Sequence, residues 1–202
     1  MWDERYNTPN YMYGKEPNDF LKANIRHIPK GPILCLADGE GETPSIWLNV
    51  AMMSPRLIYR QSHWRKQESS QQEQGVRVNF IHADLASYDL GQQQWDGIVS
   101  IFCHLPSALR TKLHHAVYRS LQNSGTYLVE GYTPQQLHYK TGGPSAVDMM
   151  LSAEILAQEL HPMHPFTLTE KERFIQEGQL HNGLSHVVQA LFIKPENEAR
   201  IY

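Results

Sequence analysis

The sequence has few cysteines, no long apolar run and no basic start. Only two of its 202 residues are cysteines, Cys35 and Cys103, and both lie in or just after apolar segments. We therefore expect small, buried side chains here and no disulfide pair. No segment approaches the roughly 18 to 20 unbroken apolar residues of a membrane helix, and the first residues do not read as a signal peptide. These absences predict a soluble, cytoplasmic protein.

The sequence also lacks an excess of positive charge. Lys and Arg number 18 and Asp and Glu 21, and the formal net charge is -3. Because the basic residues are scattered along the chain, neither a nucleic acid nor a membrane surface is an expected partner. The eleven histidines have no carboxylate or thiolate companions at ligand spacing, so we expect no metal site. A chain of this length, with 41% apolar residues, predicts a single domain over residues 1–202.

Apolar segments that resemble buried strands recur along the chain, with helical patterns between them. This alternation is typical of parallel strands joined by crossover helices, and so of an α/β fold. Turn signals between the last two apolar segments predict a terminal antiparallel pair. The expected strands are Ile33 to Leu36, Val76 to Ile81, Gly97 to Phe102, Thr126 to Glu130, Phe166 to Ile175 and Val187 to Ile193.

Two helical stretches are expected in the second half of the chain. Residues 106–121 carry apolar side chains close to a helical period, and Asn123-Ser124-Gly125 ends that pattern. Residues 133–165 form a longer excursion with an apolar helix around Met149 to Leu160. An excursion at the carboxyl edge of an α/β sheet usually contributes to a substrate site.

The first apolar segment runs into closely spaced glycines, Gly39 and Gly41. Backbone amides at the end of a strand can approach an anion or a ribose only where side chains are absent, so this turn predicts a cofactor site. A nicotinamide fingerprint would have a third glycine where Pro44 stands. A nicotinamide-dependent oxidoreductase is therefore a weak rival interpretation.

Two further polar positions follow expected strands. Asp84, next to Leu85, could accept a hydrogen bond from an adenine amino group, although an Asp at such a place is commonly a turn residue. His104 follows the strand that ends near Phe102. Parallel strands present their carboxyl ends at one edge, so His104 and Asp84 are expected at the same edge as Gly39.

Six separated segments together resemble class I S-adenosylmethionine-dependent methyltransferases of the tellurite-resistance (TehB-like) group, in matching order and spacing over nearly the whole chain. They are Trp2 to Tyr6, Tyr13 to Asn18, Leu36 to Gly41, Ile98 to Pro106, Glu130 to Pro134 and Thr141 to Pro144. The resemblance implies a Rossmann-like, mainly parallel seven-stranded sheet with helices on both faces. It also implies that residues 1–30 include a cofactor-covering segment and that residues 133–165 lie on the substrate side.

The resemblance assigns roles to individual positions. The implied S-adenosylmethionine-binding residues are Tyr13, Gly14, Ala37, Asp38, Gly39, Gly41, Asp84, Leu85 and Phe102. His104 and Tyr132 would face the methyl-transfer region as catalytic candidates. Methyl transfer is a direct displacement, so aligning a small-molecule acceptor with the methyl group can supply much of the catalysis without a covalent nucleophile or a metal.

Residues 42–70 depart from the resemblance. Family members continue the glycine turn with Arg-Asn, a helix and a strand whose final acid binds both ribose hydroxyls, whereas a gapless match puts Ile58 in the place of that acid. A shifted reading frame can be tested by joining the third base of each codon, from Glu42 onward, to the first two bases of the next codon. With allowed choices of the third bases, the genetic code then permits the residues N-A-V-Y-L-A-Q-R-G-Y-D-V-T-A-V-D-L-S-A-V-A-L-A-K-A-R-K-L-A. This shifted reading has the helix and the strand ending in Asp, so we infer two compensating frame changes.

The altered stretch motivates a second interpretation. If the chain is made as written, it lacks the ribose acid, and Pro55 cannot donate to a strand ladder. The alternative function is therefore a methyltransferase-fold protein with impaired or lost cofactor binding.

Overall fold

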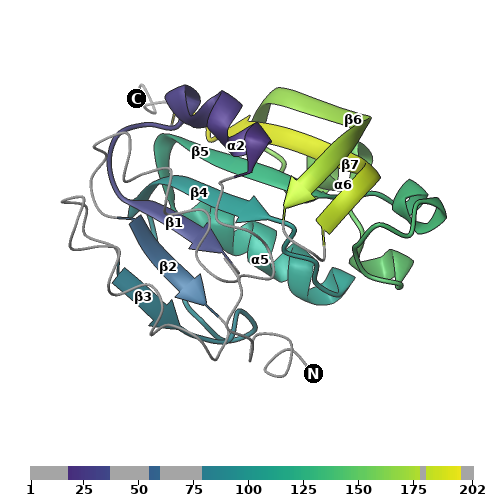
Figure 1. The fold of residues 1–202 in the computed structure, drawn as a ribbon. Helices are drawn as coiled ribbons and strands as arrows, with labels where there is room; N and C mark the ends of the chain where they lie inside the picture. Colours follow the sequence, from purple (N-terminus) through teal and green to yellow (C-terminus); the bar gives the residue numbers. More distant parts are fainter. Residues whose placement is uncertain (1–17, 37–54, 60–78, 178–180, 197–202) are drawn as a thin grey trace.

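A computed structural model describes residues 18–36, 55–59, 79–177 and 181–196 (Figure 1). Seven strands form one sheet in the order β3-β2-β1-β4-β5-β7-β6. The strands are β1 (Ile33–Leu36), β2 (Pro55–Tyr59), β3 (Asn79–His82), β4 (Trp95–Ile101), β5 (Leu121–Tyr132), β6 (His164–Glu177) and β7 (His181–Ile193).

The sheet is mixed. Strands β3, β2, β1, β4 and β5 are parallel to one another, whereas β7 runs antiparallel to β5 and to β6. All four residues of β1 are buried, as expected for a parallel strand covered on both faces. The prediction of an α/β fold with a mainly parallel sheet and a terminal antiparallel pair is confirmed.

Helices cover both faces of the sheet (Figure 1). On one face, α2 (Asp19–Asn24) and the short helix η1 (Ile25–His27) pack on a cluster that includes Cys35, Val99 and Leu128. On the other face, α5 (Ser107–Ser120) and α6 (Ala153–Glu159) pack on a larger cluster that includes residues of β1, β4, β5 and β7. Successive side chains along a strand point to opposite faces of the sheet, so the same strands contribute residues to both clusters.

The connection between β5 and β6 is the expected excursion. After β5 the chain forms two short helices, η3 (Pro134–His138) and η4 (Val147–Met149), and then α6. The helix expected around Met149 to Leu160 begins later than its apolar pattern, because Ser152 caps α6 through a hydrogen bond from the Ile155 amide to Ser152 Oγ, 3.1 Å.

The apolar pattern does not show strand β2, although the resemblance implies a strand here with Ile58 in the place of its final acid. Residues 55–59 pair in register with β1 and with β3. Pro55 is the first residue of the strand, a position where its missing N–H is tolerated. The expected strand from Val76 is described only over Asn79–His82.

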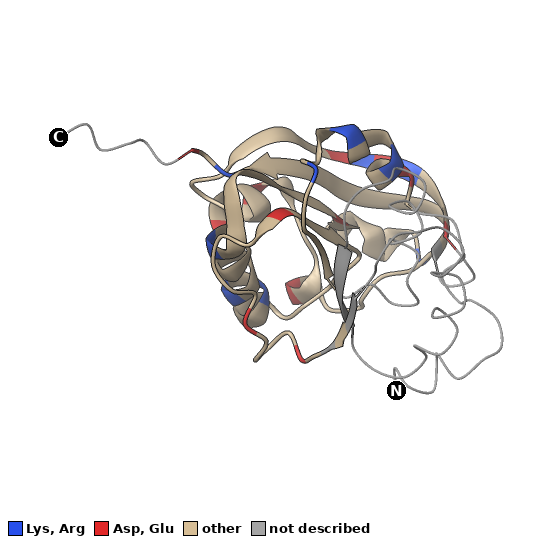
Figure 2. Ribbon diagram, turned by 90° about the vertical axis from the view of Figure 1, so that its left-hand side faces the viewer, with Lys and Arg blue, Asp and Glu red and all other residues tan. Residues whose placement is uncertain are grey.

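Charges of both signs are spread over the helices and the sheet (Figure 2). Within the described parts of the chain, no helix is long and apolar enough to span a membrane. Neither Cys35 nor Cys103 forms a disulfide; Cys35 is buried and Cys103 only partly so.

Candidate functional site

The candidate site lies where β1 and β4 end side by side. β1 pairs with β2 on one side and with β4 on the other. The chain runs from β1 to β2 and β3 on the first side and then crosses to β4 on the second, so the strand order reverses at β1. Leu36, the last residue of β1, is in register with Ser100 near the end of β4. In open α/β sheets, ligands bind in the crevice outside the carboxyl ends at such a switch point.

The backbone turns sharply after β4. Phe102 adopts a left-handed conformation with φ of 50°, its amide donates to the Glu130 carbonyl oxygen at 2.8 Å, and its own carbonyl accepts from the His104 amide at 3.1 Å. A bulky L-residue in this region costs roughly 1–3 kcal/mol, and such strain is concentrated at functional sites. The turn therefore marks the end of β4 as part of the candidate site.

Three rings gather at the ends of β4 and β5. The ring of Tyr132 stacks on that of Phe102, with centroids 4.6 Å apart, and lies nearly parallel to that of His104, with centroids 5.5 Å apart. Tyr132 is fully buried. We refer to Phe102, His104 and Tyr132 as the aromatic cluster.

His104 uses both ring nitrogens within the chain. Its Nδ1 lies 3.0 Å from the Met149 carbonyl oxygen, which can only accept, so the hydrogen is assigned to Nδ1. Its Nε2 accepts from the Tyr132 amide at 3.3 Å. Burial lowers the pKa of His104 to about 4, against the opposing effect of the Met149 carbonyl. The neutral imidazole thus joins the end of β5 to η4.

The loop with two consecutive glycines lies against the aromatic cluster. Gly143 has φ of 90°, and a Cβ there would lie 2.8 Å from Cδ2 of Tyr132. The buried Gln136 side chain holds the loop, donating to Thr141 Oγ1 at 2.9 Å and to the Gly142 carbonyl at 3.2 Å. Gln136 Oε1 accepts from the His186 amide at 2.8 Å, which attaches the loop to β7.

Gly143→Ala is expected to lower the free energy of unfolding by about 1–3 kcal/mol, because it combines a left-handed backbone with a contact to the Tyr132 ring. Denaturant unfolding measures the loss. Ser145→Ala, an exposed position of the same segment, is the matched control and should change stability by less than about 0.5 kcal/mol. Equal effects of the two substitutions would contradict the packing of Gly143 on Tyr132.

Asp84 and Leu85 lie farther along the edge, after β3. Asp84 forms a turn: its Oδ1 accepts from the Ala86 amide at 3.0 Å, and its carbonyl oxygen accepts from the Tyr88 amide at 2.8 Å. Leu85 packs against the larger apolar cluster. The structure thus places both residues on the expected edge, with strands β2 and β1 between them and the aromatic cluster.

Six sequence-predicted cofactor residues lie outside the described part of the chain. They are Tyr13, Gly14, Ala37, Asp38, Gly39 and Gly41. The described residues agree only in part with an S-adenosylmethionine site. The switch point and the strained turn are present, but Ile58 is in register with Leu36 near the end of β2, at the place where the resemblance implies an acid.

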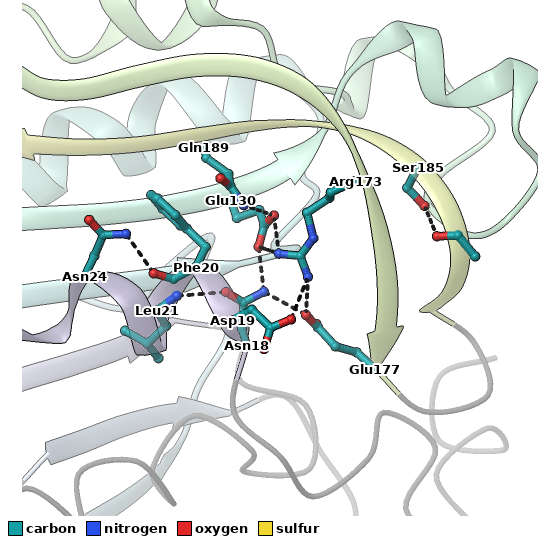
Figure 3. A network of polar contacts seen from close by, with 11 residues as sticks. Asn18, Asp19, Phe20, Leu21, Asn24, Glu130, Arg173, Glu177, Ser185 and Gln189 are labelled. Carbon is teal, nitrogen blue, oxygen red and sulfur yellow. Dashed lines mark hydrogen bonds and ion pairs between the residues drawn. The ribbon is translucent and has the colours of Figure 1, made fainter.

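A buried polar network beside Tyr132 was missed by the sequence reasoning (Figure 3). Glu130, on β5, has no exposed surface. It accepts hydrogen bonds from Asn18, from Arg173 on β6 and from Gln189 on β7. The signal was available, because a glutamate at the end of an apolar strand needs a charged or polar partner when that strand is buried.

A second ion-paired cluster attaches the excursion to α5. Arg110 donates to Glu159 of α6 from Nε and Nη2, at 3.2 Å and 3.0 Å, and His114 Nδ1 lies 2.7 Å from Glu159. Burial alone raises the pKa of Glu159, but the hydrogen bonds from His114, Arg110 and Thr111 outweigh it and lower that pKa to about 2. Arg110 also donates to the Asp148 carbonyl at 2.8 Å. These contacts fix η4, whose Met149 holds His104.

Comparison with solved structures gives the fold. The structure of an S-adenosylmethionine-dependent methyltransferase from Methanosarcina mazei aligns with a TM-score of 0.65 at 12% identity, over 89% of this chain and 99% of that one. TehB from Haemophilus influenzae aligns with a TM-score of 0.69 at 13% identity, over 96% of this chain and 65% of that one. The chain has the fold of class I S-adenosylmethionine-dependent methyltransferases.

A third solved structure with this methyltransferase fold contains a cofactor product. It is the Burkholderia thailandensis 1,6-didemethyltoxoflavin-N1-methyltransferase with bound 1,6-didemethyltoxoflavin and S-adenosylhomocysteine; the TM-score is 0.62 at 15% identity, over 88% of this chain and 76% of that one. Neither the comparison with protein-family models nor that with curated proteins finds a match. The TehB-like grouping stays a prediction.

Proposed function

We propose that this protein is an S-adenosylmethionine-dependent methyltransferase that acts on a small-molecule acceptor. The observation that supports it most is the strand order β3-β2-β1-β4-β5-β7-β6 with its switch point between β1 and β4, shared with methyltransferases of known structure. In this proposal the cofactor lies over the carboxyl ends of β1 and β2, beside the turn at Asp84. Phe102 lies between the cofactor and the acceptor.

The acceptor side of the proposed site is formed by the partly exposed members of the aromatic cluster, Phe102 and His104. The fully buried Tyr132 stacks on Phe102, and an aromatic ring immobilised in this way can bind a flat or apolar acceptor with little loss of side-chain entropy. Since both nitrogens of His104 are engaged, its geometry supports a positioning role: it holds the Tyr132 backbone and the excursion in place. Bound S-adenosylmethionine would supply an activated methyl group, and this chain would supply alignment of the acceptor with it.

The alternative is a protein of the same fold with impaired cofactor binding. One observation favours it: the carboxyl end of β2 carries Ile58 and Tyr59, and neither offers a carboxylate to the ribose. Loss of a charge-assisted hydrogen bond costs about 1.5–3 kcal/mol, so losing two would weaken cofactor binding by orders of magnitude. The proposed activity therefore depends on whether the altered stretch leaves enough affinity.

Calorimetric titration with S-adenosylhomocysteine separates the two functions. We expect a methyltransferase to bind it with micromolar affinity, and NADH, the control ligand, not to bind. A folded chain, verified by circular dichroism, that binds neither ligand contradicts the first proposal and supports the impaired alternative. Binding of NADH alone would contradict both and favour the oxidoreductase interpretation.

A further inference from the structure

The network beside Tyr132 contains more carboxylates than cations. Its two acids, the fully buried Glu130 and Glu177, whose side chain is 15% exposed, face one guanidinium, that of Arg173 (Figure 3). Arg173 Nη1 lies 3.0 Å from Glu130 Oε1, and Nη2 lies 3.0 Å from Glu177 Oε1. If both acids were ionised, the site would hold one uncompensated negative charge, which a buried site disfavours.

A single amide bridges the two acids. Asn18 Nδ2 donates one hydrogen to Glu130 Oε2 at 2.5 Å and the other to Glu177 Oε1 at 2.8 Å. The amide oxygen of Asn18 accepts from the Leu21 amide at 3.0 Å and so caps α2. Every polar atom of this side chain is therefore used, and it connects the first turn of α2 directly to both carboxylates.

The members of the network differ in how firmly the fold holds them. Glu130, Arg173 and Gln189 lie on strands that pair over long stretches. Asn18 precedes a helix of only six residues, and a short helix opens at a lower free-energy cost than strands that are paired over long stretches. If the network comes apart, the contact of Asn18 is therefore the one that breaks first.

We propose that Asn18, Glu130, Arg173, Glu177 and Gln189 form a proton-sensitive clamp on the start of α2. One proton, held on Glu177, keeps the clamp closed, and its loss releases Asn18. This inference concerns the scaffold and is independent of the proposed function.

Among the residues that the structure describes, the other charged and titratable groups near the clamp do not supply the missing positive charge. Asp19, from α2, adds negative charge 4.0 Å from Arg173 but is 79% exposed. Lys171, on β6, acts on Glu130 only as a more distant charge. Burial, together with the charges of Glu177 and Glu130, raises the pKa of Tyr132, which stays neutral. The backbone of Glu177 pairs with that of His181 across the hairpin.

The direction of the pH effect follows from linkage. Burial and then the charge of Glu130 raise the pKa of Glu177 to about 7. In the open state Glu177 is hydrated and returns toward its usual pKa of 4.5. The closed state therefore binds the proton more tightly, so its added stability is complete below the open-state pKa and is lost as the pH rises through about 7.

Hydrogen exchange of the full chain tests the clamp. After correction for intrinsic rates, protection of the Leu21 and Lys22 amides, which bond to Asn18, should fall about ten-fold from about pH 6 to about pH 8. Glu177→Gln, which mimics the protonated acid, should abolish that fall. Asp19→Asn, which removes only the exposed acid, is the matched control and should keep it.

Two outcomes would overturn the proposal. The first is that protection of the Leu21 and Lys22 amides does not fall with rising pH in the wild type, or that it falls by the same factor in Glu177→Gln. The other needs no variant: the side-chain carboxyl carbon-13 signal of Glu177 in the wild-type chain should titrate near pH 7, and a midpoint near 4.5 would refute a proton held on Glu177. Neither measurement uses the cofactor, so a result that overturns the clamp leaves the methyltransferase proposal unaffected.

Discussion

A chain in which the shifted reading replaces residues 42–70 is expected to bind S-adenosylhomocysteine at least about ten-fold more tightly than the present sequence. The replacement puts an aspartate at the carboxyl end of the second strand, where Ile58 is in register with Leu36. A carboxylate there could accept from both ribose hydroxyls. Each charge-assisted bond contributes about 1.5–3 kcal/mol, and about 1.4 kcal/mol corresponds to a factor of ten in affinity. Calorimetry of the two chains measures the difference.

A matched control carries the same replacement with asparagine in place of that aspartate. It should fold like the replaced chain, by far-ultraviolet circular dichroism, yet lose most of the gained affinity. Equal affinities in all three chains would contradict the role of the acid. Resequencing the coding DNA tests the origin of the stretch separately, because codons that cannot give the shifted residues exclude a frame change.

Arg173→Met is expected to lower the free energy of unfolding by about 3–5 kcal/mol at neutral pH, because it leaves the Glu130 carboxylate buried without its cation. Glu130 has no exposed surface, so water cannot replace the guanidinium without opening the sheet. Methionine preserves most of the side-chain length, which separates the loss of charge from the loss of volume. Denaturant unfolding measures the change, provided that the slope of the unfolding free energy against denaturant concentration is the same in both chains.

The double variant Arg173→Met with Glu130→Gln should recover part of that loss, because a neutral amide has no buried charge to compensate. Arg26→Met, at an exposed position, is the control and should change stability by less than about 0.5 kcal/mol. A double variant no more stable than Arg173→Met alone would contradict the assignment of the loss to the Glu130 charge.

The sequence predicted the strands whose apolar character comes from burial on both faces. Ile33 to Leu36 and Gly97 to Phe102 correspond to β1 and β4, because a parallel strand covered by helices needs a continuous apolar run. β2 could not be recognised in this way. Its residues Pro55–Tyr59 carry a proline and an arginine, and their pairing depends on β1 and β3, which are distant in sequence.

The candidate site was predicted in position but not in its contacts. His104 follows β4, as expected, but the partners of its two nitrogens come from Met149 and Tyr132. The clamp unites Asn18, Glu130 and Arg173 from three distant segments. The local pattern around Glu130 indicates that this acid needs a partner, but it carries no information on which distant residues supply one.

The position of β2 and β3 at one end of the sheet bears on how a cell would treat an altered chain. Cellular quality control removes proteins in proportion to how often they unfold. The buried clusters of the described residues are formed mainly by β1, β4, β5, β7 and the helices. An altered chain that keeps these strands paired and these helices packed would give chaperones and proteases little to detect. Abundance of the protein in a cell would then be a poor guide to whether its cofactor site works.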